Sequence, residues 1–142
     1  MNRKLNCILL VDDDELTNFL HRLVLEKSGF TQQIKIADSG KEALDYLENS
    51  EAGNSADLYP SPDLIFLDIN MPAMNGWEFL EEYKKMNLKS RTIVVMLSTS
   101  LFVGDKLKAE AIPEISGFED KPLTAEKVEA AIKKYFSGVV TE

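Results

Sequence analysis

The sequence predicts an α/β protein, built as a doubly wound three-layer sandwich around a parallel sheet. Short apolar runs rich in β-branched residues alternate with segments of helical period, and this happens five times without an internal repeat. Such alternation is typical of βαβ units, whose helices cover both faces of a parallel sheet. We therefore expect five βα units in one domain spanning residues 1–142, with its core at about residues 4–137.

The first two units follow from periodicity and capping. The first strand is expected from about Leu5 to Val11. In the helix after it, five apolar residues fall on one face by their spacing: Leu16, Phe19, Leu20, Leu23 and Val24. His21 falls near the polar side of this helix, and we expect it to be solvated. A less buried strand follows at 34–36, and Ser39 with Glu42 forms a predicted capping box that opens the next helix.

A surface loop separates the second and third units. Residues 50–62 carry Ser, Gly, Asn and two prolines without periodicity, which is typical of a loop. A strand at 63–67 follows, then a helix from about Asn75 and a strand at 92–97. This segment places a buried strand directly before Asp68.

The last two units are shorter. A helix is expected at 103–112, ended by Pro113. A strand near Gly117 and Phe118 belongs at the sheet edge, because the two acids that follow it are hard to bury. Thr124 is the predicted N-cap of the final helix, which ends near Ser137. Residues 138–142 are then a short tail, and we expect no output domain.

Composition excludes several classes of function. Sixteen basic and twenty-four acidic side chains give a net charge of −8, which repels the phosphate backbone of nucleic acids. The aliphatic runs are far shorter than the roughly 20 residues that span a bilayer. The apolar stretch in the first residues is too short for that of a signal peptide, so we expect none. The single cysteine, Cys7, is interpreted as a small buried hydrophobic residue. We expect a cytoplasmic protein that binds neither nucleic acid nor membrane.

Polar residues follow four of the five predicted strands. In open parallel sheets, ligands bind outside the carboxyl ends of the strands. The first strand ends on residues 12–14, all Asp, and the third ends on Asp68. The fourth ends on the Ser-Thr-Ser run at 98–100, and the fifth on Lys121 and Pro122. Each residue alone could be a helix cap or part of a turn, but their convergence on one edge indicates a site.

The residue types at this edge point to a divalent cation and phosphate. Carboxylates brought close together raise each other's pKa unless a cation keeps them ionised. Oxygen ligands without His or Cys favour Mg²⁺ or a similar ion such as Mn²⁺. A carboxylate beside such an ion can attack phosphorus and form an aspartyl phosphate. Ser98 and Lys121 are suited to hold the phosphoryl oxygens.

Four motifs resemble the receiver domain of two-component response regulators. They are "ILLVDDDE", "LIFLDINMPAMNG", "VVMLSTS" and "EDKPLT", and the resemblance extends from about Lys4 to Phe136. The chain looks most like the CheY-like single-domain members. This resemblance implies a flavodoxin-like (βα)5 fold with strand order 2-1-3-4-5. It also implies a signalling phosphoprotein rather than an enzyme, present as a monomer or as a phosphorylation-dependent dimer.

The resemblance assigns the acidic residues. It implies that Asp68 accepts a phosphoryl group from a phosphohistidine on a sensor histidine kinase or a histidine phosphotransfer protein. Asp13, Asp68 and the backbone carbonyl of Asn70 would bind Mg²⁺, and Asp12 would hold a metal-bound water. The phosphate would then be relayed, or would change the surface that a partner binds.

It also assigns the residues around the phosphate. Ser98 would hydrogen-bond one phosphoryl oxygen and Lys121 would pair with another, with a cis bond before Pro122. Small Thr99 would leave the phosphate pocket open. Phe118 would turn inward and remodel the face made by the fourth helix, fifth strand and fifth helix, although a simple core ring is the alternative.

Three sequence features depart from the family pattern. The loop at 50–62 lengthens the spacing between Asp13 and Asp68, and Glu119 and Asp120 replace an apolar pair before the Lys-Pro step. A third departure is the fourth helix, expected at 103–112, which matches the family least well.

Two other functions remain open. A Mg²⁺-dependent phosphohydrolase with an Asp nucleophile would use a D-x-D pair, whereas Asn70 follows Asp68 at that spacing. A receiver-like module could instead bind a protein without being phosphorylated.

Overall fold

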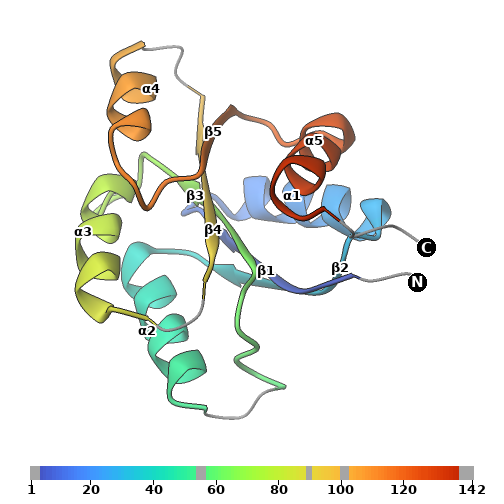
Figure 1. Ribbon diagram of the computed structural model, residues 1–142, viewed down its shortest axis with the longest axis horizontal. Helices are drawn as coiled ribbons and strands as arrows, with labels where there is room; N and C mark the ends of the chain where they lie inside the picture. Colours follow the sequence, from blue (N-terminus) through green and yellow to red (C-terminus); the bar gives the residue numbers. More distant parts are fainter. Residues whose placement is uncertain (1–3, 54–56, 89–90, 100–102, 138–142) are drawn as a thin grey trace.

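The computed structural model describes residues 4–53, 57–88, 91–99 and 103–137. Five parallel strands form one sheet in the order β2-β1-β3-β4-β5, with helices on both faces (Figure 1). The strands are β1 (Leu5–Val11), β2 (Thr31–Ala37), β3 (Leu64–Asp68), β4 (Ile93–Ser98) and β5 (Gly117–Asp120). The helices are α1 (Glu15–Ser28), α2 (Gly40–Glu51), α3 (Gly76–Met86), α4 (Val103–Glu110) and α5 (Ala125–Tyr135). The predicted fold class and strand order are confirmed.

The central strands are buried on both sides. All five residues of β3 are buried, and in β1 only Asn6 is exposed. Continuous aliphatic runs are typical of parallel strands covered by helices on both faces. At the two edges, β2 and β5 are only partly buried, as their mixed composition predicts.

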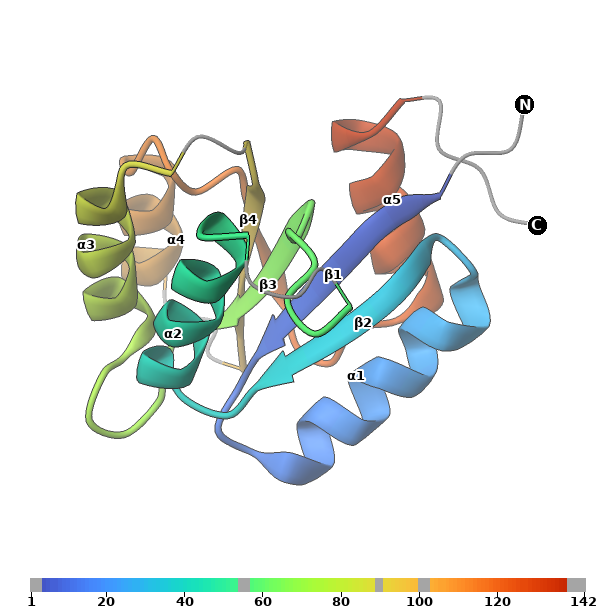
Figure 2. The same ribbon diagram turned by 90° about the horizontal axis from the view of Figure 1, so that it is seen from below.

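Two hydrophobic clusters, one on each face, hold the three layers together. Alternate residues of the strands point to opposite faces, so Leu9 joins one cluster and Leu10 the other. The first cluster packs against α2 and α3, and the second against α1 and α5. Figure 2 shows this division, with α2, α3 and α4 on one side of the sheet and α1 and α5 on the other.

In the part of the chain that the structure describes, polar side chains cap the N-termini of four helices. Asp14 caps α1, Thr124 caps α5, and Asn75 forms a complete capping box with the third residue of α3. The capping box predicted for α2 is wrong in one half. Ser39 accepts the N–H of Glu42, but the Glu42 carboxylate accepts the N–H of residue 38 instead of that of Ser39.

The orientation of α1 differs from the prediction. Its buried residues are Asn18, His21 and Leu25. Four of the five residues of its apolar face lie exposed, and we refer to them as the α1 stripe: Leu16, Phe19, Leu20 and Leu23. The fifth, Val24, is half-buried and packs against the second cluster. A solvated His21 was therefore the wrong expectation, since this side chain is only 2% exposed.

The physical reason is that the buried side of α1 faces backbone groups that need polar partners. Asn18 Nδ2 donates to the carbonyl oxygen of Asp12 at 2.8 Å, and His21 Nε2 accepts the N–H of Leu123 at 3.2 Å. Buried backbone groups without a partner are costly. The polar side of the helix therefore turns inward, although Leu25 still packs in the second cluster.

The segment between α2 and β3 is anchored where it is described. Tyr46 of α2 donates its hydroxyl to the carbonyl of Pro60 and packs edge-on against the Tyr59 ring. Cys7 is fully buried in β1, as expected. Residues 54–56, Ser100 and the tail at 138–142 lie outside the described residues. Within the described ranges, no helix combines the length and apolar character needed to cross a membrane.

Candidate functional site at the carboxyl edge of the sheet

The strand register brings the four predicted strand ends together. Val11 pairs with Leu67, so Asp12, the residue after β1, lies at the same level as Asp68, the last residue of the adjacent strand β3. On the other side of β3, Asp68 is in register with Leu97, directly before Ser98. Ser98 is in register with Asp120, which precedes Lys121. Residues far apart in the chain thus meet at one edge of the sheet.

Three carboxylates gather there. Asp12, Asp13 and Asp68 each offer an oxygen, and these oxygens lie within 4.8 Å of one another. Asp12 and Asp68 are buried, each about 4% exposed, whereas Asp13 is exposed. Two of the three carboxylates are therefore shielded from water, and the third is open to solvent.

Lys121 reaches into this cluster from the residue after β5. Its Nζ lies 2.5 Å from Asp12 Oδ2 and 2.8 Å from Asp68 Oδ1. Its backbone N–H donates to the carbonyl of Ser98 at 2.8 Å, which fixes the start of the loop to β4. The peptide bond between Lys121 and Pro122 is cis.

Asp12 is held at every polar group. Its N–H donates to the carbonyl of Ala37, its Oδ1 accepts the N–H of Asp14, and its carbonyl accepts Asn18 Nδ2. Asp14 in turn accepts from both the backbone N–H and the hydroxyl of Thr17. The first acid of the run thus lines the site, while the third starts α1.

The turn after Asp68 depends on Gly76. The Gly76 N–H donates to the carbonyl of Ile69 at 2.8 Å. A Cβ at Gly76 would lie 2.7 Å from the carbonyl oxygen of Asp68, closer than real Cβ atoms approach, and 3.0 Å from the Cα of Ile69, which is tighter than most real contacts. Because glycine has no Cβ, α3 can begin directly against the backbone of the acid.

Burial and charge perturb both partners of the central ion pair. Burial raises the pKa of the Asp68 carboxyl, the hydrogen bond from Lys121 opposes this rise, and the charges of Asp12 and Asp13 add to it. Burial lowers the pKa of the Lys121 ammonium, but its hydrogen bonds to Asp12 and Asp68 outweigh burial and the net shift is upward. These shifts favour the charged form of Lys121, whereas an ionised Asp68 needs positive charge beside it.

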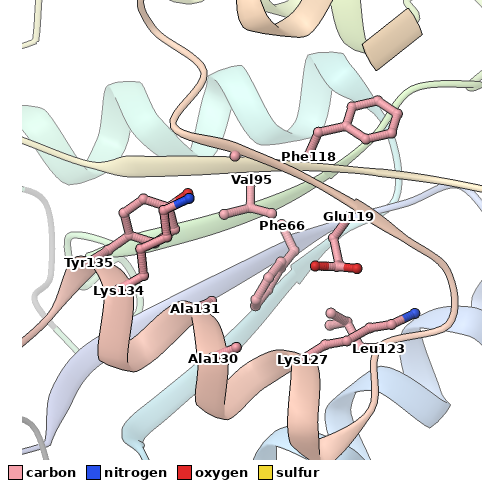
Figure 3. Close-up of a pocket in the computed structure, with 11 residues that line it drawn as sticks. Phe66, Val95, Phe118, Glu119, Leu123, Lys127, Ala130, Ala131, Lys134 and Tyr135 are labelled. Carbon is pink, nitrogen blue, oxygen red and sulfur yellow. The ribbon is translucent and has the colours of Figure 1, made fainter. Parts of the chain in front are cut away.

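The remaining predicted residues surround this centre. Ser98 is fully buried at the end of β4, and Thr99 after it is exposed. Asn70 is exposed, two residues beyond Asp68. Phe118 is half-buried and packs against the first cluster, outside the group of carboxylates. Figure 3 shows its ring on the side of β5 opposite to Glu119, which points toward α5.

Sequence reasoning missed the two polar residues that hold this edge from α1. Asn18 and His21 contact backbone groups of Asp12 and Leu123. Their signal was present, because Asn18, His21 and Leu25 share one helical face at spacings of three and four. The larger apolar face of the same helix concealed it.

The donor set fits a divalent cation. The cluster offers carboxylate oxygens with neither His nor Cys, and hard oxygen ligands suit Mg²⁺. Part of the negative charge faces solvent at Asp13, where an ion could enter with its waters.

Comparison with known proteins identifies the family to which the chain belongs. A model of the response regulator receiver domain matches residues 8–133. The chain belongs to the family of response regulator receiver domains. Its structure superimposes on that of a two-component response regulator from Cytophaga hutchinsonii with a TM-score of 0.82, at 35% identity over 93% of this chain and 97% of the other. It is also 32% identical to the chemotaxis protein CheY of Bacillus subtilis, covering 89% of this chain and 94% of CheY.

Receiver domains also occur within longer proteins. The chain is 37% identical to the protein-glutamate methylesterase/protein-glutamine glutaminase of Treponema denticola, over 74% of this chain but only 25% of that protein. The similarity therefore concerns the signalling receiver domain.

Proposed function

We propose that this receiver domain accepts a phosphoryl group on Asp68 and acts as a signalling phosphoprotein rather than as an enzyme with turnover. The observation that carries the proposal is the buried Asp68 carboxylate at the end of β3, paired at 2.8 Å with Lys121 and clustered with two further carboxylates. A desolvated carboxylate beside a fixed cation is suited to attack phosphorus, because its negative charge is not masked by water.

The acidic cluster would hold Mg²⁺ or Mn²⁺. Asp13, Asp68 and the backbone carbonyl of Asn70 would bind the ion, and Asp12 would hold one of its waters. The bound ion supplies positive charge that neutralises the carboxylates and the phosphoryl oxygens. The raised pKa of Asp68 supports this role, since positive charge would keep that carboxyl ionised at neutral pH.

The transfer step uses the residues around Asp68. A carboxylate oxygen of Asp68 attacks phosphorus, the bond from phosphorus to the donor's imidazole nitrogen breaks, and the imidazole leaves with that electron pair. Lys121 pairs with one phosphoryl oxygen, and the Ser98 hydroxyl donates to another. Thr99 is small enough to leave the approach open.

The α1 stripe supports a protein as the donor, namely a sensor histidine kinase or a histidine phosphotransfer protein. Four exposed apolar side chains on one helical face form a patch suited to a partner helix. This patch is continuous with the site, because Asp13 and Phe19 line the same cleft of about 440 Å³. A docked donor would therefore stand next to the carboxylates.

The consequence of phosphorylation would appear at β5. Phe118 is half-buried on this edge strand, so its ring can change position without opening the central core. We assign the surface of α4, β5 and α5 as the face that responds, through partner binding or a phosphorylation-dependent dimer. Relay of the phosphate to another protein is the other use of the same acyl phosphate.

Labelling with a small phosphodonor tests the proposal. With Mg²⁺ and radiolabelled acetyl phosphate, the chain should gain one hydroxylamine-labile phosphate. Asp68→Asn should abolish the label, whereas the control Asp45→Asn, at an exposed acid on α2, should keep it. A label that persists in Asp68→Asn would remove this residue from its role. Repeated turnover of a generic phosphate ester would instead favour the phosphohydrolase.

A further inference from the structure

We propose that His21 of α1 is a positioning residue for Lys121, because its neutral imidazole holds the β5–α5 loop in the place from which Lys121 reaches Asp68. The β5–α5 loop is defined here as residues 121–124. This inference rests on the proposed function of Asp68. It assigns to the chain's one histidine a structural role in phosphoryl transfer.

The position of Lys121 depends on a short loop with separate anchors. The sheet holds the loop through the N–H of Lys121, which donates to the carbonyl of Ser98. Helix α5 holds it through Lys127, whose Nζ donates to the carbonyls of Asp120 at 2.9 Å and Pro122 at 3.1 Å. Figure 3 shows Lys127 extending beside Leu123 below the end of β5.

The third anchor comes from α1 and is buried. The N–H of Leu123 donates to His21 Nε2 at 3.2 Å. Leu123 is itself buried and packs in the second cluster, so this N–H lies in the protein interior, away from water. A donor buried in this way needs an acceptor. Without His21 the loop can satisfy this N–H only by moving, and Lys121 lies two residues away.

Acceptance at Nε2 defines the state of the ring. Nε2 can accept only when it carries no proton, so the imidazole must be neutral with its proton on Nδ1. Lys121 and Asp12 are the charged groups that act on the ring, and burial together with the Lys121 charge lowers the pKa of His21. The positive charge of Lys121 thus favours the neutral form of His21, and this neutral form is the one that accepts the N–H of Leu123 and so positions Lys121.

The geometry also explains why α1 turns a polar side inward. Through Asn18 the helix holds Asp12, and through His21 it holds the loop that carries Lys121. Asp12 and Lys121 form the short ion pair at the floor of the site. One helix therefore sets both partners of that pair.

The test compares a variant that keeps the acceptor with one that loses it. Gln in the place of His21 offers an oxygen near the position of Nε2, whereas Leu fills similar space without an acceptor. His21→Leu should lower the rate of labelling by acetyl phosphate about tenfold, since small displacements of a reacting group cost this much or more. It should also speed hydrogen exchange of the Leu123 amide. His21→Gln should restore both to within about threefold of the original chain.

A core variant separates positioning from mere stability. Leu25→Ala, on the same buried face of α1, should lower the free energy of unfolding while leaving the labelling rate of the folded protein unchanged. Wild-type labelling in His21→Leu, or equal loss in His21→Leu and His21→Gln, would overturn the inference.

Nitrogen-15 NMR of the original chain gives a readout that needs neither variant nor phosphate. The chain has one histidine, so its ring signals need no assignment. At pH 7 they should show the Nδ1–H tautomer, and the Nε2–H tautomer would overturn the inference. Absence of label on the original chain would instead remove the proposed function, and the ring tautomer and Leu123 exchange would still decide whether His21 holds the loop.

Discussion

Helices α1 and α5 lie next to each other on the same face of the sheet, yet they bury opposite kinds of side chain (Figures 1 and 2). Helix α5 buries Val128, Ala131 and Ile132 and exposes charged residues. Helix α1 buries Asn18 and His21 beside Leu25 and exposes the α1 stripe.

Helical periodicity therefore identifies the apolar face of a helix but not whether that face points toward the core or toward solvent. Helix α5 rests on aliphatic side chains, so its apolar face turns inward as hydrophobic burial requires. Helix α1 begins at the acidic edge, where backbone groups of Asp12 and Leu123 need polar partners. The apolar stripe then remains on the surface, where we propose that a partner docks.

We expect the largest difference between α1 and α5 in the stability of variants that shorten an apolar side chain on each helix. Ile132→Ala on α5 should lower the free energy of unfolding by about 2–4 kcal/mol, because it leaves a cavity in a close-packed core. Leu20→Ala on α1 should change it by less than about 0.5 kcal/mol, because this side chain is half exposed. Urea denaturation measures both. Equal losses would show that the α1 stripe is buried in solution.

The second effect sharpens the role of the α1 stripe. Phe19→Ser should slow phosphotransfer from a histidine kinase or phosphotransfer protein about tenfold, or about 1.4 kcal/mol, because an aromatic anchor is lost. Labelling by acetyl phosphate, which needs no docking surface, should be unchanged. Leu58→Ser removes a similarly exposed apolar side chain from the segment between α2 and β3, which belongs to neither proposed surface, and serves as the control. An equal loss in both variants would argue against docking on α1.

The smallest effect concerns pH and the polar side of α1. The folded-state pKa of His21 lies below its ordinary value of 6.5, through burial and the nearby charge of Lys121, with Asp12 opposing. Below about pH 6.5 the unfolded chain binds the extra proton, so the stabilisation from His21 is complete above this pH and is lost as the pH falls. His21→Gln has no such proton. The free energy of unfolding of the original chain should therefore fall more steeply from pH 7 to 5 than that of His21→Gln, and parallel curves would contradict this.

Much of the fold and the centre of the site could be predicted from the sequence. Buried parallel strands appear in the sequence as continuous aliphatic runs. The rule that ligands bind at the carboxyl ends of such strands then predicts Asp12, Asp68 and Lys121. The strand order required the family resemblance, because periodicity does not say which strands are neighbours. The register then explained why these three side chains meet.

What could not be predicted depends on contacts between distant backbone groups. The acceptor of the Leu123 N–H lies 102 residues earlier in the chain, and no local pattern relates the two. The same holds at the start of α2, where the carboxylate of Glu42 accepts a hydrogen bond from the N–H of residue 38 rather than from that of Ser39. Which side chain bonds to a given backbone group depends on how the elements are arranged in the folded protein. Helix propensity and periodicity describe single elements and carry no information about that arrangement.

The close contact at Gly76 sets a limit on how this protein can vary. The segment between α2 and β3, at the amino edge of the sheet, accommodates extra chain length and is anchored by Tyr46 and Pro60. At the carboxyl edge, one methyl group on Gly76 would press against the carbonyl of Asp68. Insertions between α2 and β3 can therefore add new surface without disturbing the carboxylate site. The turn between Asp68 and α3, in contrast, must keep its glycine for as long as Asp68 is needed for function.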